Sequence, residues 1–294
     1  MTTTAHVNHA AQGLVDRLER LDAVDPVAKP IGKVIRDTVP PGTLKDVLSG
    51  VPIGHALHPL LTDLPIGTWT SALLLDLLGG ERSRPAADRL VGFGIACTVP
   101  AVITGLTEWG DSEVGSPAAR RVGLVHAASN LTATALFSAS LAARVGGARS
   151  KGKLLALAGA GAPGAGGWLG GHLSYAQGLG VDQTAFEEAA EDWTEALPDA
   201  ELGEGDLRCI AAGGVDVLVA RVGGELHAMA NRCSHRGGPL HEGKLDDGCV
   251  TCPWHGSMFR LADGSVERGP AAYPQPSWRV RVQDGTIQVA PPEG

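Results

Sequence analysis

Two stretches decide the fold of the C-terminal part of this chain, Asn231-Arg-Cys-Ser-His-Arg-Gly-Gly-Pro-Leu-His241 and Thr251-Cys-Pro-Trp-His-Gly-Ser-Met-Phe259. Each contains a thiol coupled to its own imidazole, Cys233 with His235 and Cys252 with His255, and sixteen residues separate the two pairs. Two thiolates and two imidazoles can hold a two-iron cluster, with the thiolates on one iron and the imidazoles on the other. The same four side chains could bind zinc tetrahedrally, although zinc fingers use a cysteine pair followed by a histidine pair. The pattern therefore indicates a metal centre, with an iron–sulfur cluster and zinc as the two candidates.

The residues around these four side chains resemble the Rieske [2Fe-2S] family over roughly residues 196–292. The resemblance extends to Gly264 in a strand turn and to Gly269-Pro270, which is similar to the family's proline-bearing loop. It implies a small antiparallel β-sandwich in which Pro270 shields one [2Fe-2S] cluster and backbone N–H groups face the cluster sulfurs. The ligands that the resemblance implies are Cys233, His235, Cys252 and His255.

Departures from the family pattern indicate which kind of Rieske protein this is. Respiratory quinol-oxidising members join two cluster loops by a disulfide, but the matching positions here are Gly238 and Trp254. Ser257 keeps one hydroxyl donor to the cluster sulfurs, whereas Phe259 stands where those members have tyrosine. Because fewer donors stabilise the reduced cluster less, we predict a potential in the lower part of the Rieske span of about −150 to +300 mV. The resemblance thus implies a ferredoxin-like electron-transfer component rather than a stand-alone catalyst.

Four long apolar segments precede this region, at about residues 60–78, 90–107, 122–143 and 154–173. The last three contain no Asp, Glu, Lys or Arg, whereas the first includes Asp63 and Asp76. A run of about 20 apolar residues matches the ~30 Å hydrocarbon core of a bilayer. A soluble four-helix bundle, the alternative, would show a charged outer face at helical period. We therefore predict a four-helix transmembrane bundle with the lipid bilayer as a partner.

This helical region resembles an uncharacterised four-helix bacterial membrane domain that is found fused to Rieske modules. The resemblance covers roughly residues 50–180 and is carried by Gly54-His-Ala-Leu-His-Pro59, Leu60-Leu-Thr-Asp-Leu-Pro-Ile-Gly67 and Gly170-Gly-His172. It implies a multi-pass protein of the bacterial cell membrane, but no established activity.

The predicted fold class is multidomain, with an all-α four-helix transmembrane bundle followed by an all-β Rieske domain. An amphipathic, charged N-terminal segment is expected over residues 1–50 and the membrane domain over 51–180. An acidic linker is expected over 181–195 and the Rieske domain over 196–292.

Histidines gather at one boundary of the predicted membrane domain. Counting helix reversals puts His55, His58, His126 and His172 on the face from which the Rieske domain follows. Three functional interpretations stay open: a b-type haem held by histidines of this group, another metal, or a quinone headgroup that hydrogen-bonds to them. The fourth interpretation is that they are ordinary polar residues at helix ends, although intramembrane ionisable residues are functional candidates.

The net charge of −8 lies partly in an acidic run over residues 187–195. This run could be a solvated linker or a docking patch for a basic redox partner. The chain has no basic stripe, so we expect no nucleic-acid binding. The distribution of Arg and Lys favours a Rieske domain outside the cytoplasm, whereas cytoplasmic assembly of iron–sulfur clusters favours the opposite, and the side stays open.

Two functions fit these observations. In the first, a membrane-bound protein relays electrons between haem or quinol at the histidines and the Rieske cluster. In the second, the helical bundle is a passive anchor for a ferredoxin-like carrier that serves a separate reductase or oxygenase.

Overall fold

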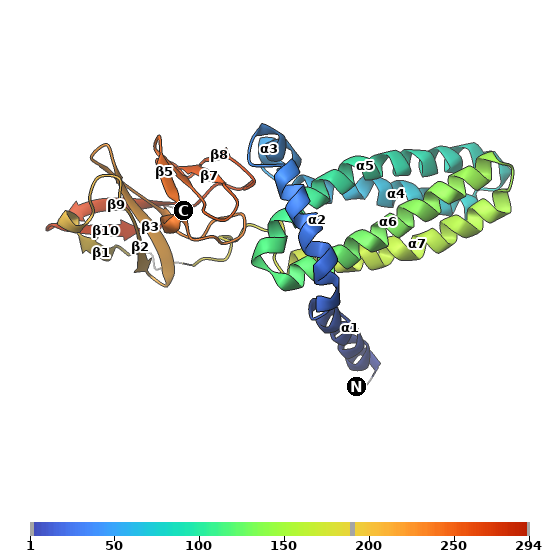
Figure 1. Cartoon of the computed structure of the whole chain (residues 1–294), viewed down its shortest axis with the longest axis horizontal. Helices are drawn as coiled ribbons and strands as arrows, with labels where there is room; N and C mark the ends of the chain where they lie inside the picture. The colour runs from blue at the N-terminus through green and yellow to red at the C-terminus, as the bar shows by residue number, and fades with distance from the viewer. Residues whose placement is uncertain (1–2, 189–191, 293–294) are drawn as a thin grey trace. The chain divides into compact units, whose positions relative to one another are not determined.

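The computed structural model describes residues 3–188 and 192–292. Helices make up the described chain before residue 180, and strands dominate after it (Figure 1). The chain divides into two compact units: a helical unit of residues up to Thr38 with Leu57–Leu179, and a β unit of Val39–Ala56 with residues from Gly180 onward. The sequence-based division differs here, because it splits residues 39–56 between an N-terminal segment and the membrane domain.

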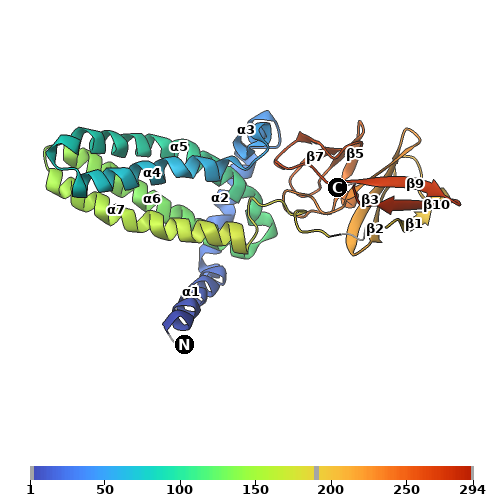
Figure 2. The ribbon, with the colours of Figure 1, turned by 180° about the vertical axis from the view of Figure 1, so that it is seen from behind.

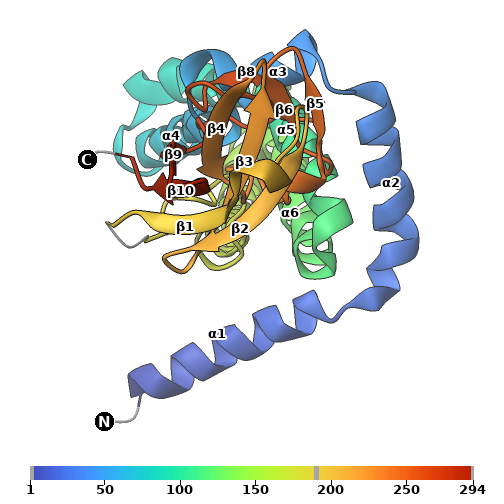
Figure 3. The same cartoon turned by 90° about the vertical axis from the view of Figure 1, so that its left-hand side faces the viewer.

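The helical unit contains a four-helix bundle and an N-terminal arm. Helices α4 to α7 run side by side (Figures 1 and 2), and α1 and α2 form a bent arm (Figure 3). The helices are α1 (Thr3–Glu19), α2 (Asp25–Thr38), α4 (Leu57–Leu78), α5 (Arg84–Gly115), α6 (Pro117–Val145) and α7 (Arg149–Gly171), with short helical turns η1 (Asp22–Val24), η3 (Glu81–Ser83) and η4 (His172–Ala176).

Local sequence signals explain both a boundary and the centre of the bundle. Ser116 caps α6, because its Oγ accepts the Ala119 N–H at 3.1 Å, and proline follows at the first helical position, where its missing N–H costs nothing. At the centre, Trp69 stacks on Phe137 with ring centroids 4.1 Å apart. Gly94 gives Trp69 room, because a Cβ there would lie 2.4 Å from the indole Nε1.

Hydropathy separates the bundle helices. Among the described residues, one helical stretch, Glu81–Ser112, is long and apolar enough to cross a membrane by length and composition, and it includes most of α5. Glycine dilutes the hydropathy of α7, Ser, Thr and Asn dilute that of α6, and α4 contains two carboxylates. Four membrane spans were predicted, and by helix length and hydropathy one described helix qualifies as a membrane span.

The β unit is built from two antiparallel sheets. A six-stranded sheet has the order β1-β10-β9-β4-β3-β2, and a four-stranded sheet has the order β5-β6-β7-β8. The strands are β1 (Thr194–Pro198), β2 (Leu207–Ala212), β3 (Val215–Val222), β4 (Glu225–Ala230), β5 (Lys244–Asp246), β6 (Cys249–Thr251), β7 (Met258–Arg260), β8 (Val266–Arg268), β9 (Ser277–Gln283) and β10 (Thr286–Ala290), with short helical turns η5 (Asp199–Glu201) and η6 (Leu240–Glu242).

Four two-residue turns set the strand register. Each has positive φ at both of its residues, as tight hairpins require, which explains why glycine and aspartate stand there. The turns are Gly213-Gly214, Gly223-Gly224, Asp247-Gly248 and Asp284-Gly285.

The predicted acidic linker over 181–195 is described except for residues 189–191, which lie outside the described chain. Its first part is attached to the β unit, since the Gln183 N–H donates to the Ser234 carbonyl at 3.0 Å. Its last two residues, Thr194 and Glu195, begin β1.

Candidate metal centre

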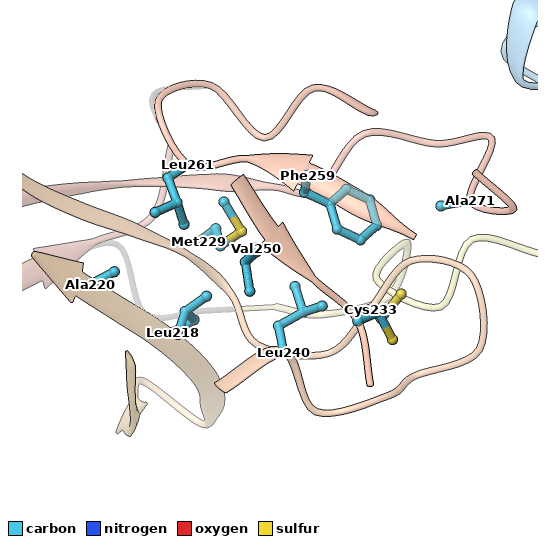
Figure 4. Close-up of a cluster of buried hydrophobic side chains, with 10 residues drawn as sticks. Leu218, Ala220, Met229, Cys233, Leu240, Val250, Phe259, Leu261 and Ala271 are labelled. Atoms are coloured by element: carbon cyan, nitrogen blue, oxygen red, sulfur yellow. The ribbon is translucent and has the colours of Figure 1, made fainter. Parts of the chain in front are cut away.

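Two loops of the β unit carry the predicted ligands. The first loop follows β4 and contains Cys233 and His235, and the second joins β6 to β7 and contains Cys252 and His255. Figure 4 shows Cys233 at the edge of the buried hydrophobic cluster that includes Leu240 and Phe259.

The two loops have the same backbone hydrogen-bond pattern. In the first, the Gly237 N–H donates to the Cys233 carbonyl at 2.7 Å, and in the second, the Gly256 N–H donates to the Cys252 carbonyl at 3.1 Å. Both glycines have positive φ, at 73° and 78°, a conformation that costs glycine no Cβ clash. Each loop therefore turns sharply directly after its ligands.

The two thiols are buried and contact each other. Cys233 is 1% exposed and Cys252 is 3% exposed. The hydrogen bond from Cys233 lowers the pKa of Cys252 to about 7, and the same bond with burial raises the pKa of Cys233. Backbone N–H groups also donate to both sulfurs, those of residues 235 and 236 to Cys233 and those of 254 and 255 to Cys252. The N–H groups thus favour negative charge on both sulfurs, whereas burial opposes it, and Cys252 is the thiol with the lowered pKa.

The two imidazoles form a second pair. The rings of His235 and His255 have centroids 5.1 Å apart and planes at 88°. His255 is 8% exposed, and burial lowers the pKa of His235. Burial therefore favours the neutral imidazole, the form that binds metals.

This arrangement fits a two-iron cluster. Within residues 3–188 and 192–292, no three Cys, His, Asp or Glu side chains converge as the ligands of a single metal ion would. A Rieske cluster needs one thiolate pair and one imidazole pair on different irons, which is how the four side chains are grouped. Gly238 leaves room for the Cys252 thiol, because a Cβ at this position would lie 2.8 Å from the Cys252 Sγ.

The other predicted site residues surround this group. Ser257 is fully buried, and its Oγ accepts the Ala271 N–H at 3.0 Å, which leaves its hydroxyl hydrogen for another acceptor. Pro270 is buried, whereas Trp254 is 51% exposed. A Cβ on Gly238 would lie 3.1 Å from the Trp254 ring. The two positions that match the disulfide of respiratory Rieske proteins are therefore neighbours in this structure as well.

Two further polar residues, Gln275 and Asn231, hold the first loop, and neither role was predicted from the sequence. Gln275 is 2% exposed, and its Oε1 accepts the Ser234 N–H at 3.0 Å. The Oδ1 of Asn231 accepts the N–H of His241 at 2.9 Å. Asn231 lies within the quoted motif, but Gln275 is 41 residues from Ser234 in sequence, and no local pattern marks it.

The structure brings together two of the four histidines predicted to gather at a membrane boundary. The rings of His58 and His126 have centroids 6.4 Å apart. His172 instead pairs with Glu19 at 2.9 Å. His55 belongs to the β unit, where its ring lies 5.7 Å from that of Tyr273.

Antiparallel sheets with two Cys/His loops define an iron–sulfur protein of the Rieske type, and the comparisons with known proteins agree. Residues 192–279 match the Rieske [2Fe-2S] domain, and residues 54–183 match a family described as a predicted membrane protein (DUF2231). The chain belongs to the Rieske [2Fe-2S] family, as a fusion of this domain to a DUF2231 domain.

Three curated relatives share the Rieske part. The 3-phenylpropionate/cinnamic acid dioxygenase ferredoxin subunit of Escherichia coli is 37% identical, with 33% of this chain and 92% of the relative covered. The anthranilate 1,2-dioxygenase ferredoxin subunit of Burkholderia cepacia is 34% identical, with coverage of 34% and 85%. Apoptosis-inducing factor 3 of Homo sapiens is also 34% identical, but the match spans 30% of this chain and only 15% of that protein. The Rieske part of the chain is therefore similar to ferredoxin subunits of dioxygenases.

Proposed function

We propose that this protein is a membrane-anchored electron carrier with one [2Fe-2S] cluster. In this proposal Cys233 and Cys252 hold one iron, and His235 and His255 hold the other. The main support for this proposal is that the two thiols form one pair and the two imidazoles form another, on two loops with the same hydrogen-bond pattern. The cluster, when bound, supplies a one-electron redox centre, and the protein supplies no further chemistry at this site.

The residues around the cluster would set its potential. The backbone N–H groups that donate to both cysteine sulfurs stabilise negative charge there, as would the hydroxyl of Ser257. Phe259 is fully buried in the hydrophobic core and adds no donor. We infer a low-to-moderate potential within the Rieske range, because hydrogen bonds to the sulfurs are among its main determinants.

The bundle would anchor the carrier in a bacterial membrane through four spans. Apolar side chains are exposed on every bundle helix: Leu60 (59%), Phe93 (56%), Leu131 (56%) and Leu157 (56%). Large apolar side chains exposed on all four helices are expected where a bundle contacts a membrane or a partner. The full chain should stay in the membrane pellet after an alkaline carbonate wash and be released by detergent. Recovery in the carbonate supernatant would contradict the anchor.

The electron partner would be a separate protein. Because two of the relatives are named as ferredoxin subunits of dioxygenases, we infer an oxygenase component or a reductase as the partner class. The described part of the acidic run over 187–195 could contribute to docking.

A second candidate function, an electron relay through the bundle, is favoured by His58 and His126. Each donates its Nδ1–H to a backbone carbonyl, His58 to Ala101 at 2.9 Å and His126 to Gly166 at 2.8 Å. Such a bond orients an imidazole whose other nitrogen binds a metal. Asn130 Nδ2 donates to the His126 Nε2 at 3.2 Å, so haem or quinone would have to replace this bond.

An optical spectrum separates the two functions. In the relay with haem, the detergent-purified protein shows a Soret band and an α-band that sharpens with dithionite, and His126→Leu removes both. His227→Leu, in the β unit, is the matched control and should keep them. Rieske absorption alone would favour the passive anchor over a haem relay.

A further inference from the structure

The N-terminal arm, formed by α1 and α2, is fixed to one end of the helical bundle by polar contacts. Asp25, at the start of α2, pairs with Arg120 and Arg121 of α6 at 3.0 Å and 2.9 Å. At the end of α1, the Oε1 of Glu19 lies 2.9 Å from the Nε2 of His172. The arm is therefore held in a defined position within the helical unit.

Helix α2 lies at the level where the apolar part of α5 ends. The apolar run of α5 stops at about residue 107, and the stretch that qualifies as a span is Glu81–Ser112. Arg36 donates to the Gly110 carbonyl at 2.8 Å, and a Cβ on Gly110 would lie 2.9 Å from the Ile35 Cγ2. Figures 1 and 3 show α2 crossing the bundle helices rather than running along them. A helix that crosses a membrane-spanning helix at its end lies along the membrane surface, which is the position of an interfacial helix.

One side of α2 is apolar and exposed. Val27, Ile31 and Val34 are 56%, 39% and 63% exposed, and we call these three side chains the apolar stripe. Their spacing of four and three residues places them on the same side of the helix. The buried residues of α2 are Ala28 and Gly32, so the apolar stripe is not the surface that packs on the bundle.

The opposite side of α2 is charged. Lys29 and Lys33 stand two residues after the first two members of the apolar stripe, which is about 200° around the helix axis. Their side chains are 59% and 71% exposed, and each pairs with a carboxylate one turn away, Asp25 or Asp37. Because these charges are balanced within the helix, burial of the apolar stripe would supply the attraction to a membrane surface.

We propose that the arm is an interfacial element whose apolar stripe inserts into the lipid bilayer. This inference rests on the proposed function, because it needs the bundle to span the membrane. Amphipathic helices of this kind bury their apolar side about 5–10 Å into the boundary between headgroups and acyl chains, while lysine side chains extend to the headgroups. A second protein fits the apolar stripe poorly, since a stable interface needs about 20–30 residues on each side and the stripe offers three.

The arm also leads directly into a segment that holds a loop of the metal centre. Helix α2 ends at Thr38, and the residues that follow, 39–56, belong to the β unit. They contain α3 (Thr43–Ser49), in which the Asp46 Oδ1 accepts the Gly269 N–H at 2.9 Å. An arm inserted in the bilayer would therefore connect the membrane surface to the proline-bearing loop through one continuous stretch of chain.

The test is depth-dependent fluorescence quenching in the full-length protein, reconstituted in phosphatidylcholine vesicles. Val34→Cys is labelled with an environment-sensitive maleimide, and the lipids carry a nitroxide either near the headgroup or near the end of an acyl chain. The nitroxide near the headgroup should quench Val34→Cys several-fold more strongly than Lys29→Cys, the matched control on the charged side of the same helix. Wild-type protein treated with the same maleimide gives the background from the native cysteines.

A second control separates this proposal from the membrane anchor. Leu131→Cys, at the midpoint of α6, should be quenched most by the nitroxide near the chain end. Quenching of Leu131→Cys, with Val34→Cys no more quenched than Lys29→Cys, would overturn the role of the arm and leave the anchor in place. An absence of quenching at both positions would instead refute the anchor on which the proposal rests.

Two further outcomes complete the test. Disulfide-linked dimers of Val34→Cys without quenching would assign the apolar stripe to a second copy of the chain, which would overturn the proposal. If Val34→Cys does not fold, Val27→Cys carries the same comparison with Lys29→Cys.

Discussion

Gln275 shows how one amide side chain can hold a cluster loop. Besides accepting the Ser234 N–H, it donates through Nε2 to the carbonyls of Ala230 at 2.7 Å and Arg232 at 2.6 Å. These groups belong to the end of β4 and to the first loop, which otherwise has little regular structure. The side chain replaces the strand partners that the loop backbone lacks.

Removing this amide should destabilise the β unit. Gln275→Leu leaves buried backbone groups without a partner, and each such group costs about 1–3 kcal/mol. We expect a lower thermal unfolding midpoint and faster loss of the iron–sulfur absorption on heating. Gln283→Leu, at an exposed position in β9, is the control and should change neither. Equal stability of the two variants would show that Gln275 does not hold the loop.

At the scale of single residues, the sequence predicted what is local. The two Cys/His pairs, Gly238 and Ser257 stand in short motifs, and the structure groups them at one site. Gln275 is 41 residues from Ser234, whose N–H it accepts, so no spacing indicates it. His172 was expected beside the other histidines, but Glu19 from α1 pairs with it, a contact that counting helix reversals cannot predict.

At the scale of helices, a charge network joins all four bundle helices at one end. Arg144 of α6 is fully buried and forms ion pairs with Asp76 of α4 and Asp88 of α5. Arg149 of α7 contacts the same two carboxylates, at 3.0 Å and 2.9 Å. Asp76 made the first apolar segment a weaker span candidate by sequence, but in the structure two arginines compensate its charge.

Breaking this network should destabilise the bundle strongly. Arg144→Met removes the fully buried arginine and leaves Arg149, which is partly exposed, to pair with both carboxylates. Removing one member of a buried pair costs about 3–5 kcal/mol. Thermal unfolding in detergent, followed by circular dichroism, should show a clear fall in midpoint. Lys33→Met breaks the exposed pair with Asp37, which is worth at most about 1 kcal/mol. A fall in Arg144→Met no larger than that of Lys33→Met would contradict a structural role for the network.

Element type was easier to predict than membrane spanning. The four apolar segments correspond to α4 through α7, because long apolar runs persist as helices in either environment. Whether each helix crosses a bilayer depends on its summed hydropathy, and the small and polar residues of α6 and α7 lower that sum.

At the scale of the whole molecule, the chain passes between its two units more than once. It leaves the helical unit after Thr38, contributes residues 39–56 to the β unit, and returns to the helical unit at Leu57. His55 and His58 therefore belong to different units but are three residues apart, which limits their Cα atoms to about 11 Å in any arrangement of the units. Sequence composition does not reveal that residues 39–56 belong to the β unit, because this short segment is assigned to that unit only by its contacts.

The measurement that most directly tests the central claim is EPR spectroscopy of the dithionite-reduced full-length protein and two cysteine variants. The wild-type protein should show the signal of a histidine-ligated [2Fe-2S] cluster, and Cys252→Ala should lose it. Cys249→Ala is the matched control, because Cys249 is buried within β6 and is not a predicted ligand, so its signal should persist. An intact Rieske signal in Cys252→Ala would contradict the assignment of the metal centre.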